Sequence, residues 1–387
     1  MRILILDTHY PESLRQVYES KPQLAQHSSH EQLQTIYETG FGRADSLPLN
    51  LRKVGHEAEQ FIVNAQPIQT SWANEHGLEI QTKRSTAMRV RQRLQRTVNQ
   101  LRDKSTTVGM SVPKWEMDVV LAQARTFKPD VIFICDVLYL PAHFHRTLKD
   151  YTKLLVGEMA YPIPSGLDLT PFDLIISAAP HFVDRLRKAG ARSELLRLGF
   201  EQTILDRLGN QTKDVELAFV GFVSKAHQQR LELLEELCRK VPISFWGAGG
   251  ESLPADSPLR GRVQPPLWGY DMYRQLQRSK IALNIHIDMA EQYAANMRLY
   301  EATGVGTMLL TDWKVNLPDL FELGKEVVAY RSADECVELV KYYLAHDSER
   351  ESIAKAGQQR TLCEHSYYHR MQELTEILNR YLGSGSV

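Results

Sequence analysis

Short apolar runs alternate with amphipathic helical stretches along most of the chain. A strand buried inside a parallel sheet is apolar almost throughout, because helices cover both faces of such a sheet. In the first half, the predicted strands are residues 3–6, 58–63, 131–135, 154–156, 174–177 and 195–198. In the second half, they are residues 216–223, 243–249, 280–287, 307–312 and 326–332. Runs of this length also fit buried helices, but the Gly, Pro and Asp residues that bound them favour strands. The pattern predicts an α/β protein with doubly wound parallel sheets.

The length of the chain predicts two domains. Its 387 residues exceed one ordinary α/β core of roughly 150 to 200 residues. The expected parts are an N-terminal Rossmann-like domain at 1–205, a linker at 206–214, a second Rossmann-like domain at 215–365, and a C-terminal helix and tail at 366–387. The linker sequence, DRLGNQTKD, is polar and has no apolar period. The final helix is predicted from the helical spacing of Met371, Leu374, Leu378 and Tyr381.

The composition is that of a soluble globular protein. No apolar run approaches the roughly 18 residues that cross a membrane, and the N-terminal run turns polar too early for a secretory signal. We therefore expect a cytoplasmic protein. The net charge of −1 gives no overall attraction to nucleic acid, so no nucleic-acid partner is expected. The four cysteines are far apart and form no CxxC pair, so neither a disulfide nor a cysteine metal site is expected.

An insertion at about residues 70–116 interrupts the alternation. Residues 83–104, KRSTAMRVRQRLQRTVNQLRDK, carry eight basic side chains and one acidic side chain. The apolar positions recur at helical spacing: Ala87, Val90, Leu94, Val98 and Leu101. This predicts a basic amphipathic helix. Its basic face is either a solvated surface or a contact for an anionic acceptor or a membrane surface.

Doubly wound sheets bind ligands beyond the carboxyl ends of their strands. The residues that directly follow the strands of the second half are therefore the candidates for ligand binding. Gly221 lies at the end of the first of these strands, and Lys225 and Arg230 lie around the start of the next helix. A helix N-terminus and two cations would stabilise a diphosphate. The alternative places Arg230 on the surface of an amphipathic helix.

The strand ISFWGAG ends in residues suited to a flat ligand. The segment lacks the G-x-G-x-x-G spacing and the acidic residue of a dinucleotide site, so nicotinamide binding is not expected. Trp246 and Gly247 would instead flank a base. Trp246 fits a core position equally well.

The segment NMRLYEATGVGTMLLTD holds the most informative pair of charges. Arg298 and Glu301 stand at i and i+3, so they share one face of a helix that Asn296 would cap. A carboxylate accepts hydrogen bonds from vicinal hydroxyls, as in ribose recognition, while an arginine binds phosphate. The preceding strand delivers His286 and Asp288 to the same edge. The alternative is that Arg298 and Glu301 form a surface ion pair.

These residues lie in a half that resembles the retaining GT-B glycosyltransferases of family 4, most closely the CgeB-like spore-maturation branch. The resemblance covers most of residues 216–370. It rests on the segments FVGFVSKAHQQRLELLEEL, WGYDMYRQLQRSKIALNIHID and NMRLYEATGVGTMLLTDWKVNLPDLFELGKEVVAYRSADECVELVKYYLAHDSERESIAKAGQQRTLCEHSYYHR. LVGEMAYPIP and FDLIISAAPHFVDRLRKAGARSELLRLGFE resemble the same branch more weakly. The resemblance implies two facing Rossmann-like lobes, with a nucleotide sugar held mainly by the C-terminal lobe in an interdomain cleft.

The same resemblance assigns roles to the charged residues. Glu301 matches the second glutamate of the E-x7-E signature, which binds ribose, and Arg298 matches the arginine that this branch places before it. Arg230 and Lys225 fall where the diphosphate-binding arginine and lysine lie, although the usual G-R…K order is altered.

One feature of the family signature is missing. Its first glutamate would fall on Tyr293. The resemblance therefore leaves the contacts to the transferred sugar open, with Asn296 or Asp288 as substitutes.

In the N-terminal lobe, the candidates are strand-end residues that would orient the sugar or the acceptor hydroxyl. They are His9, Tyr10, Glu158 and His181, of which His181 joins Arg298 and Arg230 as a catalytic candidate. Hydrogen-bonded structural roles are the alternative for the two histidines. Asp136, His143 and His145 do not have the spacing of a metal site.

The sequence thus predicts a retaining, metal-independent hexosyltransferase that uses a nucleoside-diphosphate sugar, UDP in preference to GDP, as co-substrate and needs no further cofactor. The acceptor would be a glycan, a small molecule or a protein. It would attack on the face of the leaving group, with the donor phosphate taking its proton. The alternatives are a sugar-nucleotide epimerase of the same fold and a non-catalytic protein that binds sugar nucleotides or glycans.

Overall fold

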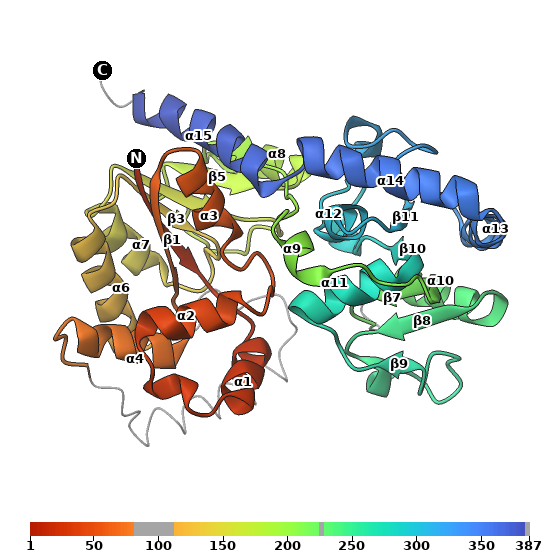
Figure 1. Cartoon of the computed structure of the whole chain (residues 1–387). Helices are drawn as coiled ribbons and strands as arrows, with labels where there is room; N and C mark the ends of the chain where they lie inside the picture. The colour runs from red at the N-terminus through yellow and green to blue at the C-terminus, as the bar shows by residue number, and fades with distance from the viewer. Residues whose placement is uncertain (81–111, 224–227, 384–387) are drawn as a thin grey trace. The chain divides into compact units, whose positions relative to one another are not determined.

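The computed structural model describes residues 1–80, 112–223 and 228–383 (Figure 1). The chain forms two compact units. Unit 1 comprises Met1–Glu38, Pro48–Leu195 and Leu374–Val387, and unit 2 comprises Thr39–Leu47 and Leu196–Glu373. The predicted basic helix at 83–104 lies outside the described residues.

Unit 1 contains a parallel six-stranded sheet in the order β2-β1-β3-β4-β5-β6. Its strands are β1 (Arg2–Asp7), β2 (Glu57–Ile62), β3 (Val131–Ile134), β4 (Leu154–Glu158), β5 (Leu174–Ser177) and β6 (Ser193–Leu195). The prediction for residues 195–198 was wrong. β6 pairs with β5 only from Ser193 to Leu195, and beyond it the carbonyl of Leu198 accepts a hydrogen bond from Arg370 instead.

Unit 2 contains a second parallel six-stranded sheet, in the order β12-β11-β10-β7-β8-β9. Its strands are β7 (Val215–Val220), β8 (Ile243–Trp246), β9 (Val263–Gln264), β10 (Ser279–Asn284), β11 (Met308–Asp312) and β12 (Val328–Tyr330). The sequence pattern missed β9, because two residues show no period. The predicted fold class, doubly wound α/β in both halves, is confirmed.

Helices flank each sheet (Figure 1). Those that pack in unit 1 are α1 (Pro11–Ser20), α2 (Ser29–Tyr37), α3 (Ser46–Lys53), α4 (Gln66–Glu75), α6 (Lys114–Phe127), α7 (Ala142–Lys149) and α8 (Pro180–Lys188). Those of unit 2 are α9 (Ile204–Leu208), α10 (Gln228–Lys240), α11 (Gly269–Arg278), α12 (Arg298–Gly304), α13 (Ala333–Ala345) and α14 (Asp347–Glu364). The predicted C-terminal helix is α15 (Tyr367–Gly383), and four short 3-10 helices are η1 (Leu24–Gln26), η2 (Gly250–Ser252), η3 (Asp288–Ala290) and η4 (Leu317–Asp319).

The chain passes between the units at four places, after Glu38, Leu47, Leu195 and Glu373. The predicted linker at 206–214 therefore lies inside unit 2. It begins within α9, where Ile204 and Leu208 are buried in the core of that unit. The sequence DRLGNQTKD does not predict the burial of Leu208, because one apolar residue among polar ones does not form a helical period.

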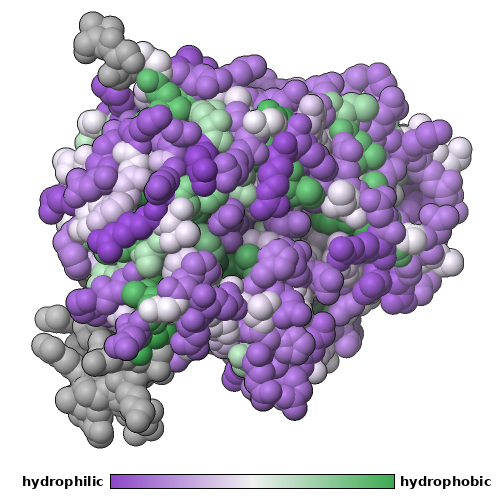
Figure 2. All heavy atoms as spheres, turned by 60° about the vertical axis from the view of Figure 1, so that its left-hand side comes forward, coloured by the Kyte–Doolittle hydropathy of each residue, from purple (hydrophilic) through white to green (hydrophobic). Residues whose placement is uncertain are grey.

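Each sheet is covered by apolar side chains on both faces, as its near-continuous apolar strands predict. On the face shown in Figure 2, polar side chains predominate and apolar side chains gather in small groups. Among the helices of the described residues, none is long and apolar enough to cross a membrane.

Candidate functional site

The strand order of unit 2 reverses between β7 and β10. β8 and β9 extend the sheet from β7, whereas β11 and β12 extend it from β10. At such a switch point, the connections that leave the two central strands diverge and leave a crevice beyond their carboxyl ends. Ligand-binding groups are therefore expected on or near the backbone that follows β7 and β10.

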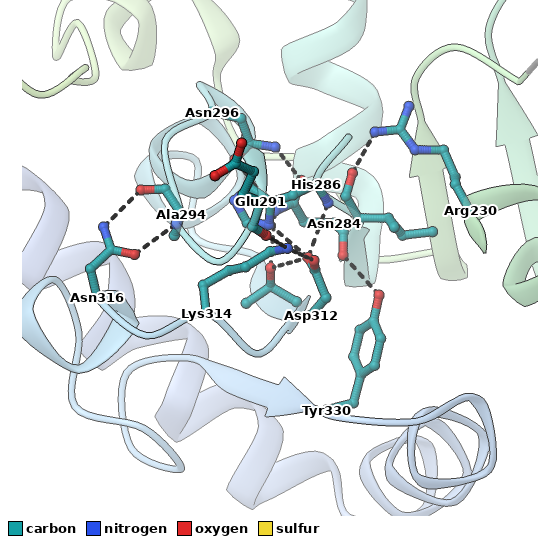
Figure 3. Close-up of polar contacts among 12 residues, drawn as sticks. Arg230, Asn284, His286, Glu291, Ala294, Asn296, Asp312, Lys314, Asn316 and Tyr330 are labelled. Carbon is teal, nitrogen blue, oxygen red and sulfur yellow. Dashed lines mark hydrogen bonds and ion pairs between the residues drawn. The ribbon is translucent and has the colours of Figure 1, made fainter. Parts of the chain in front are cut away.

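Arg230, on α10, lies buried at this switch point (Figure 3). Its Nη1 donates to the carbonyl of Phe222 beyond β7 at 3.3 Å, and its Nη2 donates to the carbonyl of Ile285 beyond β10 at 2.6 Å. Its Nε is buried and has no partner among the described residues. The alternative of a surface position for Arg230 was wrong.

The partners of Arg230 are neutral carbonyls, and within the described part of the chain no carboxylate pairs with it. Burial lowers the pKa of Arg230, although the more distant charge of Asp312 opposes this shift. Buried charges in proteins are normally paired, because an unpaired one keeps its full cost of desolvation. This guanidinium is therefore suited to an anionic ligand.

Arg298 and Glu301 form the second charged group at the switch point. Nη1 of Arg298 lies 2.9 Å from Oε2 of Glu301, and Nη2 donates to the carbonyl of Val220, at the end of β7, at 3.1 Å. Glu301 is only 6% exposed. Burial raises the pKa of Glu301, and the charge of Arg298 opposes that rise. The alternative of an i,i+3 ion pair is thus realised, but as a buried pair that ties α12 to β7.

The glycines after β7 and β8 allow two backbones to approach closely. Gly221 donates its N–H to the carbonyl of Trp246 at 2.9 Å, and a Cβ at Gly247 would lie 1.8 Å from the oxygen of Gly221. Gly249 has φ = +101°, and a Cβ there would lie 1.9 Å from the oxygen of Val223. Trp246 is half-buried and packs against the core, which fits the alternative reading of that residue.

His286, after β10, forms a pair with Asp312 at the end of β11 (Figure 3). Its Nδ1 lies 2.7 Å from Oδ1 of Asp312, and its backbone N–H donates to the same oxygen at 3.0 Å. Lys314 lies 3.2 Å from the other carboxylate oxygen. Burial alone would raise the pKa of Asp312, but the hydrogen bond and charge of His286, together with Lys314, lower it to about 2.

The prediction that Asn296 caps the helix was wrong. α12 begins at Arg298 after Met297, and the amide of Asn296 instead donates to the side-chain oxygen of Asn284 at 2.7 Å. That pair joins the loop before α12 to the end of β10. Asp288, at the start of η3, is exposed. Lys225 lies outside the described residues.

The candidates of unit 1 lie at or near the carboxyl ends of its strands. Both backbone groups of His9 bond the side chain of Asn64, at 3.0 and 2.7 Å, and the side chain of His9 is buried. Tyr10 precedes α1 and is exposed. Glu158 ends β4 and is half-buried. His181 is buried in the first turn of α8, with its ring against Phe182.

Sequence reasoning missed three polar residues of the unit 2 edge: Asp312, Lys314 and Asn284. Asp312 directly follows the apolar run TMLLT and Lys314 comes two residues later, so the strand-end rule that selected His286 would also have selected them. Within residues 1–80, 112–223 and 228–383, no group of three His, Cys, Asp or Glu side chains has the arrangement of a metal site.

Comparisons with known proteins agree with this architecture. Residues 228–376 match the sequence model of a family described as "glycosyl transferase-like". A glycosyltransferase from Rickettsia africae superimposes with a TM-score of 0.59 at 10% identity, over 98% of each chain. HepE of Anabaena, solved with UDP and glucose, gives 0.58 at 12% identity, over 98% of this chain and 100% of that one. Sucrose-phosphate synthase of Thermosynechococcus elongatus gives 0.56 at 10% identity, over 99% of both.

The chain has the GT-B fold. At identities this low, the structural likeness shows the fold alone. The family match lies in the unit that carries Arg230, Arg298 and Glu301. A comparison with curated protein sequences gave no match. Neither comparison singles out the CgeB-like branch, which stays a prediction.

Proposed function

We propose that this GT-B chain is a glycosyltransferase that takes a sugar from a nucleoside-diphosphate donor, with UDP favoured over GDP. The observation that carries the proposal is Arg230, a buried guanidinium at the switch point of unit 2 that has no carboxylate partner among the described residues. A diphosphate is the anion that such a donor would place there. HepE, which has the same fold, was solved with UDP and glucose, and that agrees with a uridine nucleotide as the guest.

The charged residues of unit 2 have separate roles in this proposal. Arg230 and Lys225 bind the diphosphate. Glu301 accepts hydrogen bonds from the ribose hydroxyls, and Arg298 keeps its carboxylate ionised and fixed. Support for the role of Arg298 comes from its 2.9 Å contact with Glu301, since an unpaired carboxylate as buried as Glu301 would bind a proton more readily.

The proposed reaction proceeds with retention at the anomeric carbon and without a metal ion. As the diphosphate departs, negative charge builds up on its oxygens, and Arg230 stabilises that charge within a fixed environment. The acceptor hydroxyl attacks on the face of the leaving group, and a donor phosphate oxygen takes its proton. His9, Glu158 and His181 of unit 1 are the proposed groups that orient the acceptor or the sugar.

The test is an assay with radiolabelled UDP-glucose, UDP-galactose, UDP-N-acetylglucosamine and GDP-mannose, with and without a panel of glycan, small-molecule and protein acceptors. We expect one UDP-sugar to be consumed, with label transferred to an acceptor or to water, and the anomeric configuration of the product, read by NMR, to match the donor. EDTA should leave the rate unchanged. Loss of activity on chelation would refute metal independence.

Two other outcomes point to other functions. An isomerised nucleotide sugar without any acceptor would identify an epimerase. Tight binding of a nucleotide sugar, with neither hydrolysis nor transfer across the panel, would identify a binding protein. The missing glutamate at Tyr293 is the sequence feature that favours the second of these alternatives.

A further inference from the structure

His286 is a buried side chain with one unused nitrogen. Its side chain is 0% exposed, and Nε2 has no hydrogen-bond partner among the described residues. A buried polar atom without a partner destabilises the fold, because it has lost its hydrogen bonds to water. Such atoms are rare in native proteins and call for an explanation, such as a ligand that completes the hydrogen bond.

Asp312 determines what His286 can bind. Because the pKa of Asp312 is lowered to about 2, its carboxylate is ionised at neutral pH. It can therefore only accept hydrogen bonds, so Nδ1 of His286, 2.7 Å away, carries the proton. Nε2 accepts a hydrogen bond in a neutral ring and donates one in a protonated ring. A hydroxyl group both donates and accepts, so it satisfies Nε2 in either state.

The position of Nε2 relates it to Arg230. The two nitrogens of an imidazole point in nearly opposite directions, so Nε2 faces away from Asp312 and β11. β7 lies on the opposite side of β10, and Arg230 bonds the carbonyl of Ile285, the residue before His286. The two unused buried groups, Nε of Arg230 and Nε2 of His286, therefore belong to the same edge (Figure 3). Nε of Arg230 suits an anion, and Nε2 of His286 suits a hydroxyl group.

We propose that His286, held by Asp312, binds a hydroxyl group of the transferred sugar and thereby distinguishes a nucleotide sugar from a free nucleotide. The inference rests on the proposed function and adds a contact to the part of the donor beyond the diphosphate. His286 is the contact residue, and Asp312 is a positioning residue that fixes its tautomer. Lys314 supports Asp312 from its other oxygen.

The test separates the nucleotide from the sugar. Calorimetric titrations measure the Kd of UDP and of UDP-glucose, UDP-galactose, UDP-N-acetylglucosamine and GDP-mannose for wild type and His286→Asn. An asparagine amide nitrogen can replace Nδ1 as the donor to Asp312, but nothing replaces Nε2, so the variant keeps the structural contact. The ratio of the two Kd values within each protein is independent of the fraction that is folded.

We expect His286→Asn to bind free UDP within about twofold of wild type and to lose about 3- to 10-fold in affinity for the UDP-sugar, as the loss of one neutral hydrogen bond predicts. Deoxy analogues of the sugar should identify the hydroxyl that His286 contacts. The analogue that lacks this hydroxyl should bind wild type less tightly than the parent UDP-sugar does, whereas His286→Asn should bind the analogue and the parent with equal affinity. An unchanged ratio, with every deoxy penalty preserved, would overturn the inference and leave the proposed function intact. Failure of wild type to bind any nucleotide would overturn both.

Discussion

The switch points of the two sheets differ in charge. In unit 2, Arg230 and Arg298 both donate to backbone carbonyls at or beyond the end of β7. In unit 1, where the order reverses between β1 and β3, the corresponding strand ends carry Asp7 and Asp136. Burial and the neighbouring charge of Asp7 raise the pKa of Asp136. One topology therefore supports two edges of different chemistry.

The difference indicates which unit binds phosphate. A diphosphate at the edge of unit 1 would meet two carboxylates. At the edge of unit 2 it would meet the guanidinium of Arg230, which pairs with no carboxylate in the part of the chain that the structure describes. Hydroxyl groups, in contrast, are compatible with the carboxylates of unit 1. We expect the donor nucleotide at unit 2 and a hydroxyl-bearing acceptor at unit 1.

The largest predicted effect concerns the buried ion pair of unit 2. Arg298→Met leaves Glu301 buried without its counter-charge, so the free energy of unfolding should fall by about 3 to 5 kcal/mol at pH 7.5, measured by urea unfolding. The loss should become smaller as the pH is lowered, because burial raises the pKa of Glu301 and removal of Arg298 raises it further. The double variant Arg298→Met/Glu301→Leu should recover most of the loss. A single variant within about 1 kcal/mol of wild type would show that the pair does not stabilise the edge.

Each unit also contains one buried histidine with a pKa lowered to about 4, His145 in unit 1 and His365 in unit 2, chiefly because of burial. As the pH falls from 6.5, the unfolded chain binds a proton at each site, whereas the folded protein does so only near pH 4. The free energy of unfolding should therefore fall by about 3 kcal/mol per histidine between pH 6.5 and pH 4.

The two histidines should respond differently to replacement. Neither ring nitrogen of His145 has a partner among the described residues, whereas those of His365 contact the carbonyl of Leu320 and the guanidinium of Arg370. In urea unfolding at pH 7.5, His145→Phe should therefore stabilise the protein and His365→Phe should destabilise it. Both variants should show less acid destabilisation than wild type. An unaltered pH dependence in both would contradict the assignment.

The smallest predicted effect is at the acidic edge. Asp136→Asn removes a carboxylate whose pKa is raised by burial and by Asp7, so the thermal unfolding temperature should rise slightly at pH 7. The gain should shrink as the pH is lowered, because the raised pKa of Asp136 lets its carboxyl bind a proton in wild type as well. UDP affinity should not change, because the substitution lies in unit 1. A weaker affinity of Asp136→Asn for UDP would indicate that the nucleotide binds at the edge of unit 1 and would contradict its assignment to unit 2.

The features that the sequence predicted correctly are those set by residues close together in the chain. Apolar runs located ten of the twelve strands in the described residues, and the helical spacing of Arg298 and Glu301 placed both on one face. The two-residue strand β9 has too few positions for a pattern. The burial of Arg230 depends on Ile285, 55 positions away, and the pair of His286 with Asp312 spans 26 positions. Only the pairing of β7 with β10 and of β10 with β11 brings these residues together, so the local sequence does not reveal them.

A calorimetric titration of UDP against wild type, Arg230→Met and Asp7→Asn tests whether the switch point of unit 2 binds the diphosphate. Loss of one charge-assisted hydrogen bond should weaken UDP binding by Arg230→Met about 10- to 100-fold, while Asp7→Asn should bind as wild type does. Thermal unfolding of each variant checks that it is folded. Equal affinity of folded Arg230→Met and wild type for UDP would contradict the claim that the switch point of unit 2 binds the diphosphate.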